Sequence, residues 1–210
     1  MLRARTDQAK DQRRQALLQA ALDEFFDRGF NAARMDDIAR RAGFTKGTLY
    51  LYFDSKEVLF TELLDMVVLP NIEKIELLIG SSSSAAQAID RLVGFAPKMI
   101  RDTQWPKFIK ILIADAGAFP EHIALYREKV IDRALAAIAG LLEQGHKRGE
   151  LEVEDAALTA KLVVAPMLFS AIWAVVFDVG RAEKLDLDAL FSLHGAMLYR
   201  ALGITKELDV

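Results

Sequence analysis

Residues 43–57 read GFTKGTLYLYFDSKE, and this stretch decides the fold of the amino-terminal part of the chain. Thr45 is a favourable N-cap for a short helix, because its hydroxyl can accept a hydrogen bond from an amide of the first turn. Successive residues of a helix turn by about 100°, so Leu49 and Phe53 fall on one face. We expect these two side chains to seal the helix onto the elements that precede it.

The outward face of this short helix carries Gly47, Thr48, Tyr50 and Leu51. Glycine weakens a helix interior by roughly 1 kcal/mol relative to alanine. Its presence therefore indicates that a partner approaches the backbone closely at Gly47. DNA is a partner that would meet this requirement.

Two further helices are readable upstream of the quoted stretch. Residues 12–28 carry a helical stripe of apolar side chains that stops at Gly29, and residues 35–42 repeat this design before Gly43. Glycine is the usual residue at a left-handed helix end. Two short helices joined by a glycine turn are typical of a helix-turn-helix, whose second helix enters the major groove of DNA.

In a helix-turn-helix the leading end of the second helix meets base edges, while nearby hydroxyls and cations hold phosphates. The residues at the leading end are Thr45, Lys46, Gly47, Thr48 and Tyr50, and Tyr52 and Lys56 are placed to hold the DNA backbone. A packing interpretation is open for each residue alone: Thr45 as a cap only, the tyrosines as half-buried, Lys56 as a solvated lysine. Their combination in one stretch favours DNA binding.

Residues 29–60 resemble the DNA-binding head of the TetR family of bacterial transcriptional regulators, among them its AcrR-like one-component repressors. The features that carry the resemblance are Gly29-Phe30, Ile38-Ala39, the turn glycine Gly43, the Leu-Tyr-x-x-Phe of residues 49–53, and Lys56-Glu57. The resemblance implies base and phosphate contacts by the residues named above. Arg34 departs from the family pattern, which often has a threonine or serine there. An arginine could contact phosphate by its charge, but it cannot cap the helix.

Charge is distributed unevenly along the chain, whose net charge is −3. Residues 1–60 contain 11 Lys/Arg against 9 Asp/Glu, so the rest of the chain is acidic. The first 14 residues form a basic arm with Arg3, Arg5, Lys10, Arg13 and Arg14. This distribution is expected if only one end of the protein meets a polyanion.

Several functional classes are excluded by what the sequence lacks. Without cysteine there can be no disulfide, thiolate zinc site or thiol nucleophile. The chain has no G-x-S-x-G, phosphate-binding glycine loop or H-E-x-x-H, so we predict that it is not an enzyme. Its three histidines are too widely scattered for a metal site, and no cofactor is predicted.

The start of the chain lacks the apolar segment of a secretory signal. The longest uncharged apolar run, residues 162–177, is shorter than the roughly 20 residues needed to cross a bilayer. We interpret it as a buried helix of a cytoplasmic protein without a membrane partner.

The sequence as a whole predicts an all-α fold of about nine helices, with a three-helix helix-turn-helix head on a larger helical body. We place the DNA-binding domain, with its basic arm, at residues 1–54 and the ligand-binding and dimerisation domain at residues 55–210. A fourth helix is expected from Lys56 toward Pro70. The remaining helices are expected at about 85–101, 105–117, 120–147, 155–178 and 187–202.

A pairing surface is expected, because one head would bind weakly and two heads about 34 Å apart reach successive major grooves. Residues 155–178 are apolar on all sides after Lys161, and in the last helix the small Gly195 and Ala196 permit close helix contact. The resemblance implies pairing through the last two helices as a homodimer. The candidate interface residues are Leu168, Ile172, Val176, Leu193 and Met197. A monomeric core is the alternative.

The resemblance also implies an effector pocket in the body. The candidate lining residues are Phe95, Met99, Trp105, Phe108, Leu112, Phe119, Tyr126, Met167 and Trp173. Ordinary core packing is the alternative for each of them. Their composition indicates a mainly apolar small molecule with one or two polar groups.

These observations together predict a transcriptional regulator, most simply a repressor, which binds a palindromic operator in double-stranded DNA. A small-molecule effector would release it from the operator. The alternative is a helical ligand carrier or protein-interaction module that does not bind DNA.

Overall fold

A computed structural model describes residues 2–117 and 119–205. Within these ranges the chain is helical and contains no strand. Short π-helical turns join some of the α-helices end to end, so the described residues form nine continuous helices, as the sequence predicts. Residues 1–68 and 107–124 form one compact unit, and residues 69–106 and 125–210 form a second.

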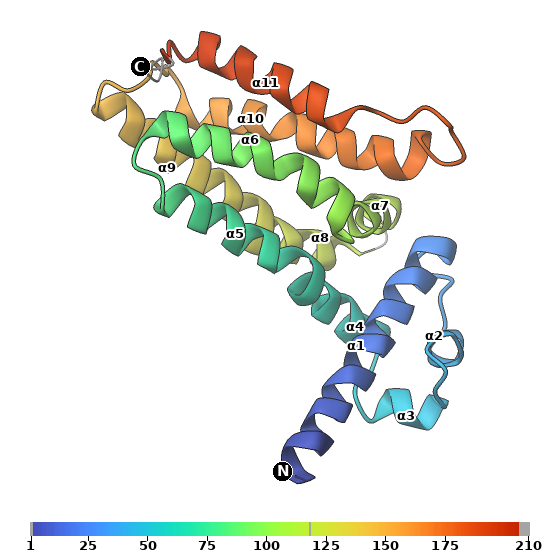
Figure 1. Ribbon diagram of the computed structural model, residues 1–210. Helices are drawn as coiled ribbons and strands as arrows, with labels where there is room; N and C mark the ends of the chain where they lie inside the picture. Colours follow the sequence, from blue (N-terminus) through green and yellow to red (C-terminus); the bar gives the residue numbers. More distant parts are fainter. Residues whose placement is uncertain (1, 118, 206–210) are drawn as a thin grey trace. The chain divides into compact units, whose positions relative to one another are not determined.

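The first unit contains the predicted helix-turn-helix (Figure 1). Its elements from the amino-terminal segment are α1 (Leu2–Arg28), α2 (Met35–Arg41), α3 (Lys46–Tyr50), α4 (Lys56–Leu63) and the π-helical turn η1 (Leu64–Val68). Leu49 and Phe53 are 0 % and 1 % exposed, and Ile38 of α2 is also buried. The predicted inward face is confirmed.

The predicted start of the first helix at Gln12 is wrong, because α1 begins at Leu2. No glycine or proline interrupts residues 2–28, and leucine, alanine, arginine, lysine and glutamine all favour helix. The segment described as a basic arm is therefore the first part of α1. The side chains of Arg3 and Arg5 lie outside the described residues.

The helix that begins at Lys56 does not end near Pro70, as predicted, but continues to the end of α5 (Leu69–Gly80). Proline has no amide hydrogen and crowds the carbonyl of the preceding turn. The π-helical turn η1 lies directly before α5 and widens the helix at this point. The helix therefore continues through Pro70 with this wider turn directly before it.

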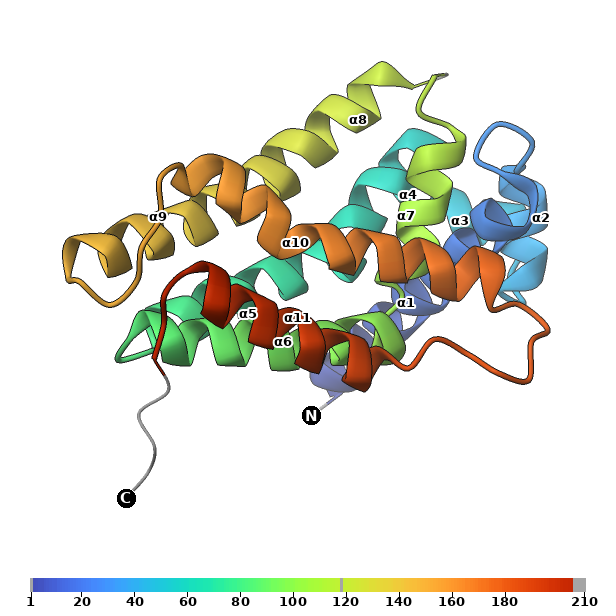
Figure 2. The ribbon, with the colours of Figure 1, turned by 90° about the horizontal axis from the view of Figure 1, so that it is seen from above.

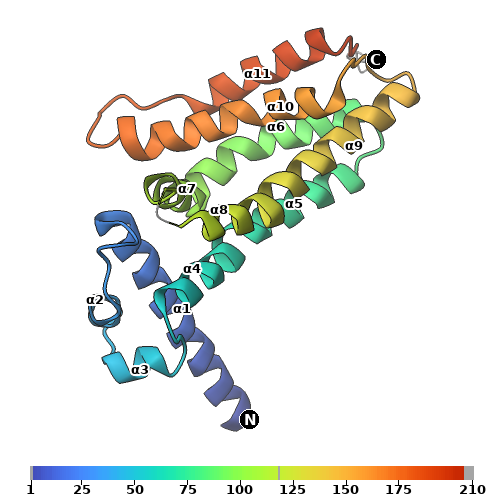
Figure 3. The same ribbon diagram turned by 180° about the vertical axis from the view of Figure 1, so that it is seen from behind.

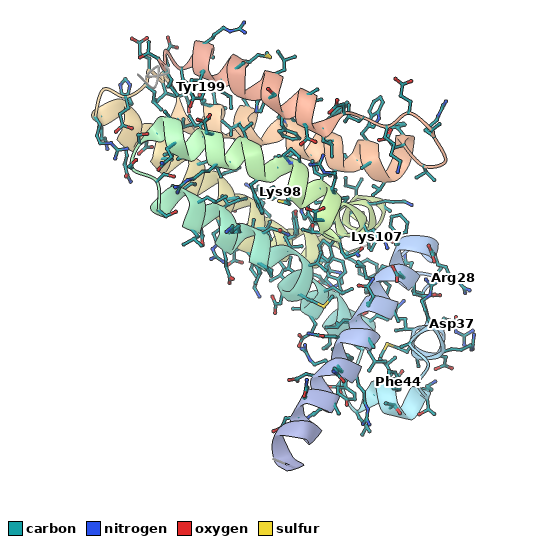
Figure 4. All side chains as sticks on the ribbon, in the orientation of Figure 1. Arg28, Asp37, Phe44, Lys98, Lys107 and Tyr199 are labelled. Atoms are coloured by element: carbon teal, nitrogen blue, oxygen red, sulfur yellow. The ribbon has the colours of Figure 1, made fainter. Side chains whose placement is uncertain are left out.

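The first unit is completed by a segment from later in the chain, which includes residues 107–114 of α7 (Trp105–Ala114) and the start of α8 (Pro120–Tyr126). The ring of Phe108 lies 5.0 Å from that of Phe60. Lys107, labelled in Figure 4, forms an ion pair of 2.8 Å with Asp23 on α1. The compact unit therefore extends beyond the predicted boundary at residue 54.

The second unit is a bundle of helices (Figures 2 and 3). With α5 it comprises α6 (Ala85–Asp102), the π-helical turn η2 (Arg127–Asp132), α9 (Arg133–Lys147), α10 (Ala156–Ile172), the turn η3 (Trp173–Phe177) and α11 (Leu187–Ala201). Helix α5 packs on α6 and α9, and α11 packs on α6 and α10. Tyr199 of α11 donates a hydrogen bond of 3.2 Å to the carbonyl of Ala86 on α6 (Figure 4).

Gly195 was expected to permit close helix contact at the pairing surface. In the structure it permits close contact between α11 and α6 of the same chain. A Cβ atom at this position would lie 3.2 Å from a methyl group of Val93 on α6. The small residue thus lets α11 approach α6 of its own subunit.

Most residues of the apolar helix α10 and its extension η3 are exposed or half-buried. By length and composition, residues 156–177 could cross a membrane. Only 22 % of the most apolar 18-residue stretch within them is buried. Ala160, Val163, Ser170 and Ala171 are buried, so within the single chain the interpretation of this stretch as a buried helix applies to its inner side. An exposed apolar surface of this kind is typical of an interaction site.

Two glycines of α9 provide a test of the packing in the second unit. A Cβ atom on Gly145 would lie 2.8 Å from that of Ala85, whereas nothing lies within 4 Å of one on Gly140. We expect Gly145→Ala to lower the free energy of unfolding by about 1–3 kcal/mol through overpacking. Gly140→Ala should raise it by up to about 1 kcal/mol through helix propensity. Urea unfolding measures both changes, and equal effects would contradict the packing described.

Candidate DNA-binding interface

Helix α3 begins at a hydrogen-bonded cap. The Thr45 hydroxyl accepts a hydrogen bond of 3.2 Å from the Thr48 amide, and the two threonine hydroxyls are 2.9 Å apart. The predicted cap is confirmed. Because both hydroxyls lie beside the first turn of α3, they can also reach a phosphate or base placed there.

The outward face of α3 is open to solvent. Gly47 is exposed, Tyr50 is 43 % exposed and Leu51 is 82 % exposed. Thr48 and Tyr52 are half-buried. The glycine turn before α3 has Gly43 at φ +76°, and Phe44, labelled in Figure 4, lies in this turn. A backbone without Cβ atoms at Gly47 and an exposed tyrosine can both approach a groove closely.

Lys46 begins α3 and already has a partner on α2. Its Nζ atom lies 2.8 Å from Oδ1 of Asp36 and 5.8 Å from the centre of the Tyr50 ring. The ion pair raises the pKa of Lys46 and lowers the pKa of Asp36. Both groups are therefore charged at neutral pH, and DNA must compete with or accommodate the pair.

Arg34 occupies the N-cap position of α2. Its backbone is extended, with φ −116° and ψ 142°, and its side chain makes no capping hydrogen bond. The arginine is exposed. Its role as a phosphate contact stays a prediction.

Lys56 is tied to the chain itself. Its Nζ atom donates to the carbonyls of Phe30 (2.8 Å) and Asn31 (3.1 Å) and lies 5.0 Å from the centre of the Phe30 ring. The amide of Phe30 donates in turn to Asp115, at 2.9 Å. These bonds fix the loop after α1, and a phosphate contact by Lys56 stays a prediction.

Sequence reasoning missed the ion-pair network that joins α1 to α2. Glu24 is 2 % exposed and lies 3.0 Å from both Arg28 and Arg41. Asp37 lies 3.5 Å from Arg28 and 2.8 Å from Arg40 (Figure 4). The i,i+4 spacing of Glu24 and Arg28 could have predicted their ion pair from the sequence. The ion pairs between α1 and α2 have no such pattern in the sequence.

A second missed feature is the aromatic cluster around His122 on α8. The imidazole stacks on Phe60 at 4.4 Å and on Phe119 at 5.3 Å, and it meets Phe30 edge-on at 5.3 Å. Burial lowers the pKa of His122, because the interior disfavours the charged ring. The cluster packs against the same loop that Lys56 and Asp115 hold.

The candidate pocket residues do not meet in one place. Phe95 and Met167 line a cavity of about 20 Å³ in the second unit. The rest of its lining consists of Ile75, Leu92, Val93, Ala96, Ile138, Val163, Val164, Phe191 and His194. The lining is apolar except for His194, whose Nε2 atom lies 3.1 Å from the carbonyl of Val163.

The other pocket candidates lie elsewhere. Trp105 donates a hydrogen bond of 3.3 Å to Tyr126, and burial raises the pKa of Tyr126 to about 12. Met99 is buried on α6, and the indole of Trp173 donates to Asp178 at 2.9 Å. Phe108, Leu112 and Phe119 belong to the first unit. Their role as ligand contacts stays a prediction.

The head contains three helices, and α3, the second helix of the motif, is capped, exposed and preceded by a glycine turn. This arrangement defines a helix-turn-helix DNA-binding protein. A sequence model described as bacterial regulatory proteins, tetR family, matches residues 17–63. A second, described as AefR-like transcriptional repressor, C-terminal domain, matches residues 87–186. The chain belongs to the TetR family of transcriptional regulators, whose members are DNA-binding proteins and not enzymes.

Relatives resemble the chain over most of its length. The regulator YfiR of Bacillus subtilis (strain 168) is 28 % identical over 198 residues, which cover 92 % of this chain and 93 % of YfiR. The transcriptional repressor BepR of Brucella suis biovar 1 is 26 % identical over 172 residues, or 78 % of this chain and 80 % of BepR. The crystal structure of a TetR-like regulator from Rhodococcus sp. RHA1 superposes with a TM-score of 0.66 and 27 % identity, covering 90 % and 94 % of the two chains.

Burial of His122 predicts a pH-dependent stability of the first unit. As pH falls through about 6.5, the unfolded chain binds a proton that the buried ring resists, so the free energy of unfolding decreases. Above this pH the ring is neutral in both states and contributes no slope. Carboxyl groups with a lowered pKa, such as Asp23 and Glu57, still contribute their full stabilisation between about pH 5 and 7.

Urea unfolding at several pH values between about 5 and 7.5 measures this slope. His122→Phe should flatten it, whereas His146→Gln, which removes an exposed histidine, should keep it. A slope that survives His122→Phe would show that another group is responsible.

Proposed function

We propose that this protein is a cytoplasmic, homodimeric repressor that binds a palindromic operator and leaves it when a small, mainly apolar ligand occupies the body. The observation that carries the proposal is the leading end of α3, where Lys46, exposed Gly47 and exposed Tyr50 surround a capped helix start. A buried inner face holds this end rigidly, and base readout requires rigid placement.

Dimer formation is supported by the exposed apolar surface of α10, η3 and α11. Leu168, Val176, Leu193 and Met197 are all exposed, and Ile172 is half-buried. Large apolar side chains exposed on two helices that pack together are typical of an interaction site. A twofold dimer uses the same patch on both subunits, so a second copy of the chain is the natural cover.

The effector site is proposed at the cavity lined by Phe95 and Met167. Its present volume of about 20 Å³ holds roughly one water molecule, far below the several hundred cubic ångströms that a drug-sized ligand occupies. A ligand must therefore displace the helices around it. The apolar lining with one histidine favours a largely apolar molecule with a single polar group.

Ligand release follows from population shift. A ligand that binds more tightly to the arrangement unsuited to DNA weakens operator binding by the same factor, without touching the interface. A difference of about 1–3 kcal/mol gives roughly 5- to 150-fold weaker binding. Repression is the proposed direction, because BepR and the matched carboxy-terminal model are both described as repressors.

The DNA contacts are tested by single substitutions. We expect Tyr50→Ala and Lys46→Ala each to abolish selective binding to an operator selected from a random pool. Loss of a phosphate contact also reduces the slope of log K against log salt by about 0.9. Fluorescence anisotropy at several salt concentrations measures both quantities.

Lys98→Ala is the matched control for this experiment, because it removes an exposed lysine from the second unit (Figure 4). It should bind as the wild type does. Wild-type affinity of Tyr50→Ala and Lys46→Ala, with helical content unchanged by circular dichroism, would refute the assigned contacts.

The interface is tested by a charged substitution on α11. Leu193→Glu places a carboxylate on the proposed apolar surface, so we expect at least a tenfold weaker dimer, since about 1.4 kcal/mol corresponds to a factor of ten. Leu77→Glu alters an equally exposed leucine on α5, at 60 % exposure for both, and should leave the dimer intact. Sedimentation velocity over a concentration series distinguishes them. A monomeric wild type would refute the dimer.

A further inference from the structure

Leu51 differs from the other large apolar side chains of the first unit in how far it is open to solvent. It is 82 % exposed, compared with 43 % for the neighbouring Tyr50 and 38 % for Val58 of α4. An exposed leucine gains free energy when a partner covers it, in proportion to the apolar area removed from water. Leu51 is therefore available to a partner that reaches this face of the head.

The packing that holds α3 in place turns Leu51 outward. Its amide lies 3.3 Å from the carbonyl oxygen of Gly47, and its backbone is in the helical region, with φ −73° and ψ −16°. Residues two apart on a helix are separated by about 200°, so Leu51 points away from Leu49. Because Leu49 is 0 % exposed and anchors the inner face, Leu51 lies on the opposite, outer face.

Gly47 leaves open space on this outer face. Residues four apart share one face of a helix, so Gly47 and Leu51 lie on the same side of α3. Among the described residues, a Cβ atom on Gly47 would have only the hydroxyl oxygen of Thr45 within 4 Å, at 3.9 Å. The edge of a base can therefore approach the backbone at Gly47 and the side chain of Leu51 together.

Base edges in the major groove offer one apolar group to such a side chain, the C5 methyl of thymine. Guanine, adenine and cytosine present hydrogen-bond donors and acceptors there, with which a leucine cannot pair. Covering those groups without replacing their hydrogen bonds to water costs free energy. A leucine on the reading face thus favours thymine and disfavours the other three bases.

We propose that Leu51 reads one thymine in each half-site of the operator through contact with its C5 methyl group. This inference rests on the proposed function, because it requires that the head bind an operator. The contact is apolar, so it adds a preference that the hydroxyls and cations of α3 do not supply.

The surroundings of Leu51 favour a single methyl group over a protein partner. The leucine borders an open groove between α1 and the end of α3, whose other lining residues are Asp7, Lys10, Asp11, Arg14 and Tyr52. The core of a protein–protein interface is an apolar patch depleted of charged residues, whereas this groove has four charged ones. One leucine among charged neighbours has enough apolar surface to cover one methyl group.

The test removes only the methyl group from the DNA. Deoxyuridine pairs with adenine as thymidine does, but it lacks the C5 methyl. An operator is selected from a random pool with the wild type, and each thymine of the half-site is then replaced by deoxyuridine at both symmetry-related positions. Fluorescence anisotropy measures the affinity of each duplex for the wild type, Leu51→Ala and Leu77→Ala. Leu77→Ala is the matched control, because it removes a leucine of 60 % exposure from the second unit.

At one position the wild type and Leu77→Ala should lose about 4-fold in affinity for each half-site, or about 15-fold for both, because one buried methyl is lost. Leu51→Ala should bind the thymine operator more weakly and show no further loss with deoxyuridine at that position. Leu51→Met keeps a long apolar side chain and should retain most of the wild-type loss. Circular dichroism confirms that each variant is folded.

Four outcomes would overturn the inference. A selected half-site without thymine, a wild type indifferent to every deoxyuridine, or a full wild-type loss in Leu51→Ala at every position would each do so while leaving an operator-binding regulator in place. In the last case, altered sedimentation of Leu51→Ala would assign the leucine to a protein contact. A wild type that binds no duplex in the selection would remove the proposed function and the inference together.

Discussion

The burial of Leu49 and Phe53 is the constraint on which the rest of the molecule depends. A helix of five residues such as α3 cannot persist alone in water, because nucleation costs more than its few hydrogen bonds return. Burial of these side chains, with α2 packed against α3, supplies the missing stability, and the Thr45 cap fixes where the helix starts. Only when the inner face is held in this way can Gly47, Tyr50 and Leu51 present a defined surface.

The charged groups around this surface are already organised before DNA is present. Lys46 is paired with Asp36, and Lys56 holds the carbonyls after α1. When DNA binds, these lysines must therefore exchange their present partners or add new ones. They are not unpaired cations that only await a phosphate. Such preorganisation reduces the entropy lost on binding and makes the geometry of the site, more than its net charge, the source of selectivity. A chain with a net charge of −3 can bind a polyanion on these terms.

The second unit is distinguished by an apolar surface that the single chain leaves partly uncovered. Helix α10 and the turn η3 are apolar around most of their circumference, and a single chain covers only part of them. Residues inside the chain are packed tightly, as Gly145 against Ala85 and Gly195 against Val93 show. Helix α11 thus combines a close-packed inner side at Gly195 with an exposed apolar outer side at Leu193 and Met197. In the proposed dimer, the outer side provides the pairing energy and the inner side encloses the cavity.

Local signals in the sequence determined the helix-turn-helix by themselves. The Thr45 cap, the left-handed glycines Gly29 and Gly43, and the inward spacing of Leu49 and Phe53 all depend on a few neighbouring residues, so a sequence pattern can express them. Contacts between distant segments were decided only by the tertiary structure. The hydrogen bond from the Phe30 amide to Asp115 joins residues 85 positions apart. The distribution of the pocket candidates over two units also depends on how the helices pack. The continuation of the helix through Pro70, with a π-helical turn directly before α5, likewise cannot be read from propensity. Spacing along one helix can be read from the order of residues, whereas the pairing of side chains from different helices depends on packing that the order alone does not specify.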